Sequence, residues 1–386
     1  MPASPSLFEM MSALVASPSV SSVSPEFDMG NRAVIDLLAG WLSDLGFSTE
    51  VIPVAEAPAK ANLIAILGEG EGGLVLAGHT DTVPYDAHLW RHDPFELVEE
   101  DGRLYGLGIC DMKGFLAIAI EAAKAFVDRR LREPLVLLAT ADEESTMIGA
   151  QRLTELGRPR ARFAVIGEPT GLTPIRMHKG VAMEALTLVG KAGHSSNPAL
   201  GVNAIDGMHT ALGVLKEWRQ ELATRHRNEG FEVPIPTLNL GHIHGGDNPN
   251  RICGHCELHY DMRLLPGMDM QQLRPEIEQR LRGALSDTGL QLHMRNLDVV
   301  IPAFEESADA ELVRLLESLC GKPARSVAFG SEAPFLQRLG MQTVVMGPGD
   351  IEQAHQPDEF LLRERIEPTL RILNALIERV CVTGPA

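Results

Sequence analysis

Residues 74–81 read LVLAGHTD, a short apolar run that ends in a histidine and an aspartate. Three further apolar runs lie at Leu135–Ala139, Phe163–Ile166 and Thr343–Met346. Short continuous apolar runs are typical of strands that are buried on both faces of a sheet. The segment Lys113–Phe126, between the first two runs, has the length and composition of a helix. Strands that alternate with helices predict an α/β fold with helices on both faces of the sheet.

The middle of the chain follows a different pattern. Its segments read as strand, helix, strand, strand, helix and strand, over Ala182–Val189, Val202–Leu222, Thr237–His244, Arg251–Leu264, Met270–Leu285 and Leu290–Val300. This order is the ferredoxin-like pattern. We therefore expect an α+β domain at residues 180–292, inserted into a first domain that residues 1–179 and 293–386 form together.

Composition and charge narrow the class of protein. A chain of 386 residues is long enough for two domains. Its formal net charge of −18 argues against nucleic acid and anionic membranes as partners, because both bind proteins through basic surfaces. No run approaches the roughly 18 apolar residues of a membrane helix, and the first basic residue is Arg32, so a basic signal-peptide region is absent. The five scattered cysteines fit a reducing compartment, and we expect the cytoplasm.

Cys253 and Cys256 form a C-x-x-C motif with His255 between them. A zinc site built on this motif would need a second pair of ligands, which the sequence does not offer in a matching motif. We interpret the segment as part of a strand.

Candidate metal ligands follow the apolar runs directly. They are His79 with Asp81, Glu143 with Glu144, Glu168, and His355, which comes after a glycine-rich turn. Asp111 precedes the helix at Lys113–Phe126. Open α/β sheets bind ligands at the carboxyl ends of their strands. The four strand ends therefore predict one shared site.

Each of these residues taken alone has an ordinary explanation. Asp111 is a favourable helix N-cap, and Glu143 and Glu144 would be stabilised near the N-terminal end of a helix. Glu168 and His355 fit turn and loop positions. Five independent coincidences at the ends of separate strands are harder to accept than one site.

The residue types indicate a centre with two metal ions. Two divalent ions about 3.5–4 Å apart need a bridging carboxylate, for which Asp111 is the candidate. Asp81 is placed to accept the second ring N–H of His79 and so to fix its tautomer. Of the adjacent Glu143 and Glu144, one would bind metal and the other would act as general base.

Seven motifs, spread over most of the chain, resemble those of the acetylornithine deacetylases, within the larger family of zinc aminoacylases, succinyl-diaminopimelate desuccinylases and carboxypeptidases. They are LAGHTDTVP (76–84), LYGLGICDMKG (104–114), LLATADEES (137–145), VIGEPT (165–170), GHSSNPALGVNAI (193–205), PTLNLGHIHGGDNPNRIC (236–253) and GPGDIEQAHQPDEF (347–360). The last two are particular to the deacetylases.

The resemblance implies a role for each candidate residue. One zinc ion would be held by His79, Asp111 and Glu168, and the other by Asp111, Glu144 and His355, with cobalt as an alternative metal. Glu143 would be the general base and Asp81 the supporting carboxylate. Relatives also have a cis peptide bond after the bridging aspartate, so we expect one at Asp111–Met112.

The inserted domain is a lid and dimerisation domain in such enzymes. His194 matches a residue that reaches the site of the partner subunit of a homodimer and stabilises the oxyanion. Asn250 and Arg263 match substrate contacts, and the arginine would bind the α-carboxylate; the alternative for Arg263 is a surface arginine at a strand end. Glu332 is our candidate for binding a substrate ammonium, and the alternative is a glutamate at a helix start.

The resemblance implies hydrolysis of N-acetyl-L-ornithine to L-ornithine and acetate, a step of arginine biosynthesis. Alternatives within the family are deacylation of acetylcitrulline, acetylmethionine or succinyl-diaminopimelate, and dipeptide hydrolysis. A metal-free binding or scaffold protein with the same fold is the rival from another class, but no ligand residue is missing.

Overall fold

The computed structural model describes residues 5–55, 57–297 and 299–384, which divide into two compact units. Unit 1 contains the residues up to Arg176, Glu306–Arg325 and the residues from Ser331 onwards. Unit 2 contains Met177–Glu305 and Ser326–Gly330. Unit 2 is longer than the predicted insertion at 180–292 because residues after 292 pair with the first residues of its long strand and with the residues just before that strand. Val181 bridges Ile301, and Phe304 lies opposite His178.

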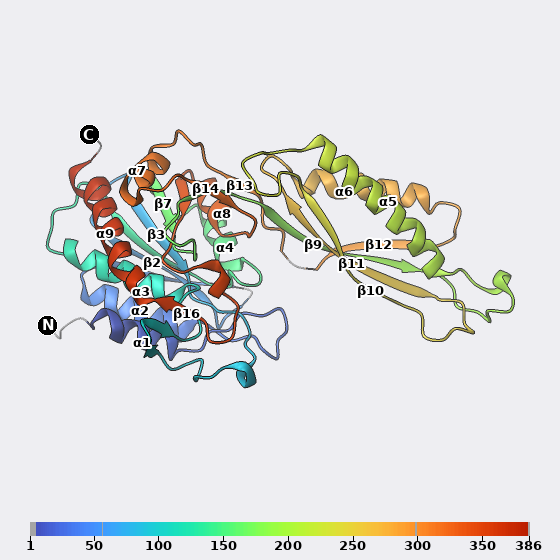
Figure 1. Ribbon diagram of the computed structural model, residues 1–386, viewed down its shortest axis with the longest axis horizontal. Helices are drawn as coiled ribbons and strands as arrows, with labels where there is room; N and C mark the ends of the chain where they lie inside the picture. Colours follow the sequence, from blue (N-terminus) through green and yellow to red (C-terminus); the bar gives the residue numbers. More distant parts are fainter. Residues whose placement is uncertain (1–4, 56, 298, 385–386) are drawn as a thin grey trace. The chain divides into compact units, whose positions relative to one another are not determined.

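Unit 1 is built on a mixed sheet, drawn in Figure 1. Its strands, in spatial order, are β1 (Ser48–Pro53), β2 (Ala61–Leu67), β6 (Leu135–Thr140), β3 (Leu74–His79), β7 (Phe163–Ile166), β15 (Gln342–Val345) and the start of β8 (Ile175–His178). β3 lies parallel to β6 and β7, and β15 lies parallel to β7. β1 and β2 are antiparallel to their neighbours. The predicted α/β fold is confirmed, and its sheet is mixed.

Every residue of β3, β6 and β7 is buried. Burial of a whole strand requires cover on both faces of the sheet. The helices of unit 1 are α1 (Leu7–Val15), α2 (Arg32–Asp44), α3 (Lys113–Ala123), α4 (Ile148–Leu156), α7 (Glu311–Cys320), α8 (Ala333–Arg338) and α9 (Ile366–Ile377), of which α2, α3, α7 and α8 pack directly on strands of the sheet. α3 packs against α1, α9 and β3, and this explains why its surface is apolar nearly all round. A small separate sheet joins β4 (Val98–Glu100), β5 (Arg103–Tyr105) and β16 (Phe360–Leu362).

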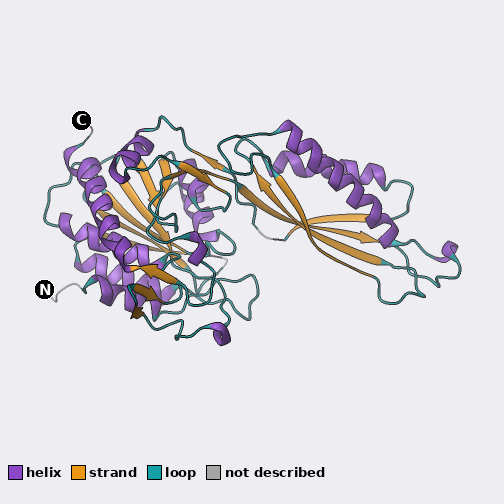
Figure 2. Cartoon of the chain, viewed as in Figure 1, coloured by secondary structure: helices purple, strands orange, loops and turns teal. Residues whose placement is uncertain are grey.

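Unit 2 has the predicted strand and helix order. Its elements are β9 (Gly180–Val189), α5 (Ala204–Arg225), β10 (Thr237–Gly245), β11 (His255–Leu264), α6 (Met270–Ala284), β12 (Gln291–Asn296) and β13 (Phe304–Glu305). The four long strands form an antiparallel sheet in the order β10-β11-β9-β12, with α5 and α6 along one face (Figure 2). Trp218 on α5 is fully buried, and its indole N–H donates to Glu276 on α6 at 3.0 Å.

Two strand boundaries differ from the sequence prediction. The strand expected from Arg251 begins only at His255, because the residues before it bond to other loops: Ile252 N–H donates to the carbonyl of Gly193, and Ala204 N–H donates to the carbonyl of Cys253. The strand expected at Leu290–Val300 is the shorter β12. Among the described residues, no helix is both long and apolar enough to cross a membrane.

Candidate metal centre

The centre lies in unit 1, at the carboxyl ends of three neighbouring parallel strands. His79 is the last residue of β3 and pairs with Thr140, the last residue of β6. Glu143 and Glu144 follow β6, and Glu168 follows β7. Parallel strands end at the same edge of the sheet, so these side chains converge although they are distant in sequence.

The Asp111 carboxylate lies between two imidazoles. One oxygen, Oδ1, is 3.1 Å from Nε2 of His79, and the other, Oδ2, is 3.5 Å from Nε2 of His355. His355 Nε2 is also 3.0 Å from Oε1 of Glu144, and His79 Nε2 is 4.0 Å from Oε2 of Glu168. This is the arrangement that a carboxylate needs in order to bridge two ions. The peptide bond between Asp111 and Met112 is cis, as predicted.

Two groups of side chains have ligand atoms within 4.8 Å of one another. They are His79 with Glu143 and Glu168, and His79 with Asp111 and Glu144. Imidazole nitrogen and carboxylate oxygen are both donors that Zn²⁺ accepts. The groups differ in part from the sets that the resemblance implies, since His79 belongs to both and His355 to neither. His355 is half exposed on its loop.

Burial and mutual repulsion dominate the electrostatics of the carboxylates. Burial, and then the charge of Glu168, raise the pKa of Glu143 well above its usual range. Burial and the charge of Asp111 do the same to the pKa of Glu168. Oδ1 of Asp81 and Oε1 of Glu168 are buried and have no hydrogen-bond partner. A cluster of this kind fits divalent cations, which would supply the missing partners and the missing positive charge.

The acidic surroundings favour the protonated form of both imidazoles. Burial lowers the pKa of His79, but the hydrogen bond to Asp111 and the charges of Glu168 and Asp81 raise it well above its usual value. Hydrogen bonds to Asp111 and Glu144 raise the pKa of His355 to about 10. Burial would raise the pKa of Asp111, yet its bonds to the two histidines hold it below its usual range.

Asp81 contacts His79 through a different atom from the one we expected. Nδ1 of His79 lies 3.0 Å from the backbone carbonyl of Asp81 and 3.8 Å from its carboxylate. The carboxylate instead accepts a hydrogen bond from the backbone N–H of Glu144 at 3.0 Å. The carbonyl therefore fixes the ring of His79, while the carboxylate holds the turn that carries the paired glutamates.

Glu332 is buried next to the same strand ends, with 1% of its surface exposed. Its Oε2 accepts a hydrogen bond from the hydroxyl of Thr140 at 2.9 Å, and burial raises the pKa of the carboxyl to about 7. It occupies the N-cap position of α8 but makes no capping hydrogen bond. Its other oxygen, Oε1, is buried without a hydrogen-bond partner.

Glu359 is a positioning residue that the sequence analysis missed. Its buried carboxylate accepts hydrogen bonds from the backbone N–H groups of Cys110, Asp111 and Gly108 at 2.8, 3.0 and 3.0 Å. Burial raises the pKa of Glu359 to about 7 although these N–H groups favour its ionised form. The residue stands four positions after His355, so one short segment carries one candidate ligand and holds the backbone of another, Asp111.

A second network supports the turn after β6. The buried ammonium of Lys60 lies 2.6 Å from Asp142 and 2.6 Å from Asp28, and Asp142 also accepts a hydrogen bond from Ser21 at 2.9 Å. Asp142 has a φ of 58°, a left-handed conformation that is uncommon for a residue with a side chain. The network therefore fixes the residue directly before Glu143.

The remaining candidates lie in unit 2. His194 and Asn250 are neighbours, because the N–H of Ser195 donates to the carbonyl of Asn250 at 3.1 Å. Both side chains are exposed. Arg263 lies near the other end of β11, where its guanidinium donates to Asp261 at 3.1 Å.

An α/β domain with a cluster of histidines and carboxylates at its strand ends is the architecture of a metal-dependent hydrolase. The sequence model of peptidase family M20/M25/M40 matches residues 75–379, and the chain belongs to this family.

The chain is similar to individual proteins in sequence and in fold. The chain is 50% identical to the acetylornithine deacetylase of Pasteurella multocida (strain Pm70) over 377 residues, 98% of each protein. Its fold is similar to that of an M20 family metallo-carboxypeptidase from Sulfolobus solfataricus, with a TM-score of 0.76, 16% identity and coverage of 97% and 99%. It is also similar to a dinuclear metal-binding M20 peptidase from Bacillus subtilis, with a TM-score of 0.67, 16% identity and coverage of 97% and 98%.

Replacement of Glu359 by glutamine should weaken metal binding by about 10–100-fold, the usual effect of losing a residue that orients a ligand. The amide would turn an NH₂ group toward one of the backbone N–H donors and loosen the loop that ends at Asp111. Equilibrium dialysis against Zn²⁺ measures the change. Glu352→Gln is the matched control, since Glu352 is exposed in the same segment. Equal affinities in both variants would refute this role.

Proposed function

We propose that the protein hydrolyses N-acetyl-L-ornithine to L-ornithine and acetate, as a cytoplasmic enzyme of arginine biosynthesis. The observation that carries the proposal is the Asp111 carboxylate between His79 and His355 in a buried acidic cluster. Identity of 46–50% to acetylornithine deacetylases over 98% of the chain supports the substrate. The five cysteines are all free, as is usual for a protein of a reducing compartment. Cell fractionation tests the proposed cytoplasmic location.

Two zinc ions are the proposed cofactors. His79, Asp111 and Glu168 would hold one, and Asp111, Glu144 and His355 the other. Bound there, the ions would polarise the amide carbonyl and lower the pKa of the attacking water. The carbonyl of Asp81 keeps the Nε2 atom of His79 directed at the cluster, because it occupies the Nδ1 side of the ring.

Glu143 is the proposed general base. It is 9% exposed and lies among the ligand atoms of His79 and Glu168. It would take a proton from the attacking water as the oxygen bonds to the acyl carbon. It would then pass this proton to the nitrogen as the carbon–nitrogen bond breaks, which releases acetate and the free amine.

We propose that His194 donates a hydrogen bond to the oxyanion in the partner subunit of a homodimer. The N–H of Ser196 donates to Nδ1 of His194 at 3.2 Å. A neutral imidazole that accepts at Nδ1 carries its proton on Nε2, so the exposed end of the ring is a donor. The carbonyl of Asn250 accepts a hydrogen bond from the N–H of Ser195, next to His194. Arg263 is the proposed partner of the substrate α-carboxylate, because a guanidinium can bind a carboxylate through two parallel hydrogen bonds. Residues 180–292 would form the lid and dimerisation domain.

A panel of substrates tests the function. We expect the highest kcat/KM on acetylornithine, and lower values on acetylcitrulline, acetylmethionine, succinyl-diaminopimelate and a dipeptide. A higher kcat/KM on another substrate of the panel would contradict acetylornithine as the preferred substrate, but it would still support amide hydrolysis. No turnover by protein with both metals bound would instead favour a binding or scaffold role.

Replacement of Glu143 by alanine should lower turnover by at least about 10²-fold, the usual contribution of a general base, while both metal ions stay bound. Replacement of Glu144 should also reduce the metal-to-protein ratio, since its carboxylate contacts His355. Elemental analysis beside steady-state kinetics separates the two effects. Near-normal activity of the Glu143 variant would contradict the assignment.

Mixing two inactive variants tests the action of His194 across the dimer. A dimer of His194→Ala and Glu143→Ala subunits has one site with both defects and one with neither, if His194 serves the partner's site. Activity should then return on subunit exchange, from a background lowered by about 10²–10³-fold for a lost oxyanion donor. If His194 acts within its own subunit, every site keeps a defect and the mixture stays inactive.

A further inference from the structure

The uncovered face of the unit 2 sheet carries a concentration of histidines. The helices α5 and α6 cover the face to which Cys256, Leu258 and Tyr260 point, and these residues belong to the core of the unit. Side chains alternate along a strand, so the residues between them point to the other face. Of the 13 histidines in the chain, five of those described lie on that face, namely His242, His244, His255, His259 and His293.

Four side chains on β10 and β11 form a compact set. His242 pairs directly with His259, and His244 pairs directly with Glu257. The Cβ atoms of residues that lie directly opposite are about 4.5–5.5 Å apart, and alternate residues of one strand are about 6.5–7 Å apart. The four side chains therefore rise from the corners of a small rectangle on one side of the sheet, within reach of a common point above it.

The spacing of two rings already suits a shared ion. The ring centroids of His242 and His259 are 5.0 Å apart, with 48° between the planes. Two imidazoles bound to one tetrahedral ion at about 2.0–2.1 Å would have centroids roughly 5 Å apart. His242 and His244 are exposed, and exposed side chains change rotamer within nanoseconds. Their rings can therefore turn toward a nitrogen of His259.

Glu257 orients His259 as a carboxylate does beside a metal-bound histidine. Its Oε1 lies 2.6 Å from Nε2 of His259, which leaves Nδ1 of that ring for another partner. The carboxylate is itself held, because Thr187 and Arg295 donate to it at 3.0 and 3.2 Å. Metal-bound histidines usually have a carboxylate partner of this kind, which orients the ring and fixes its tautomer.

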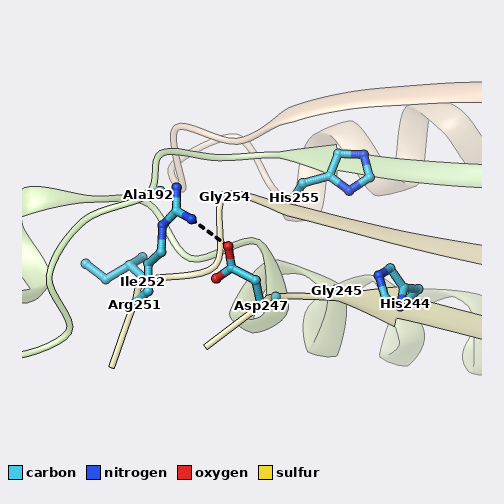
Figure 3. A pocket seen from close by; sticks show the side chains of 9 residues that line it. Ala192, His244, Gly245, Asp247, Arg251, Ile252, Gly254 and His255 are labelled. Carbon is cyan, nitrogen blue, oxygen red and sulfur yellow. Dashed lines mark hydrogen bonds and ion pairs between the residues drawn. The ribbon is translucent and has the colours of Figure 1, made fainter. Parts of the chain in front are cut away.

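A pocket beside this set gives solvent a route to it. His244 and His255 line the pocket from neighbouring strands, and Arg251 and Asp247, which also line it, form an ion pair of 2.5 Å (Figure 3). A hydrated ion can therefore reach His244 through this pocket.

We propose that His242, His244 and His259 bind a divalent transition-metal ion, with Glu257 orienting His259. Three imidazoles select Zn²⁺, Cu²⁺ or Ni²⁺ over Mg²⁺ and Ca²⁺, which prefer oxygen ligands. The ion would link the edge strand β10 to β11 and stabilise unit 2 through its preference for the folded state. The site shares no residue with the metal centre of unit 1, so it does not depend on the proposed function.

Zinc stoichiometry of the full chain tests the proposal. Equilibrium dialysis over rising free Zn²⁺, followed by elemental analysis, should show one more ion per chain in the unaltered protein than in His242→Asn/His244→Asn. Glu257→Gln should keep the extra ion but bind it about 10–100-fold more weakly. His293→Asn is the matched control, because His293 lies on the same face but on β12, beyond β9, and it should keep the full stoichiometry.

Cu²⁺ supplies an independent readout. Its electron paramagnetic resonance spectrum should show nitrogen coupling from imidazoles, which the double variant loses and His293→Asn retains. The single variants His242→Asn and His259→Asn decide the matter if the double variant unfolds, as judged by its melting curve. The proposal is overturned if the unaltered protein and these variants bind the same number of Zn²⁺ ions, or if His293→Asn loses the ion to the same degree.

Discussion

Repulsion among buried carboxylates is the constraint on which unit 1 depends. Two ionised carboxylates about 4 Å apart repel by roughly 4 kcal/mol at an effective dielectric constant near 20. A domain is stable by only about 5–15 kcal/mol, so several such pairs cannot stay ionised without positive charge between them. His79 and His355 supply part of that charge on either side of Asp111. Divalent ions would displace the protons of these rings, because a histidine binds metal in its neutral form, and would supply the positive charge in their place.

The sequence predicted the strands of unit 1 because fully buried strands leave a plain signal. The apolar runs before His79, Glu143 and Glu168 coincide with β3, β6 and β7 to within a residue or two. The common edge followed from the rule for parallel strands. Spacing alone could not show which of Glu143 and Glu144 binds metal and which acts as general base. The two residues are adjacent on a turn, where no regular periodicity predicts the direction of each side chain.

The sequence could not predict contacts in which the backbone takes part. The carbonyl of Asp81, rather than its carboxylate, meets the ring of His79. The three N–H donors to Glu359 belong to an irregular loop, and nothing in their side chains marks them as donors. The pairing of Lys60 with Asp142 joins residues 82 positions apart. In the sequence, Glu359 is marked only by its position four residues after His355. A glutamate on an exposed loop could have the same position, so the spacing does not predict its role.

Glu359 connects the segment that contains His355 with the loop that contains Asp111. Glu359 and His355 stand on one segment, while Asp111 stands on the loop whose N–H groups Glu359 binds. Any movement of that segment therefore shifts His355 and the backbone of Asp111 together. Asp111 in turn faces His79 through its second oxygen. Because Glu359 and His355 share one segment and Glu359 holds the backbone at Asp111, the two candidate ligands depend on a common support.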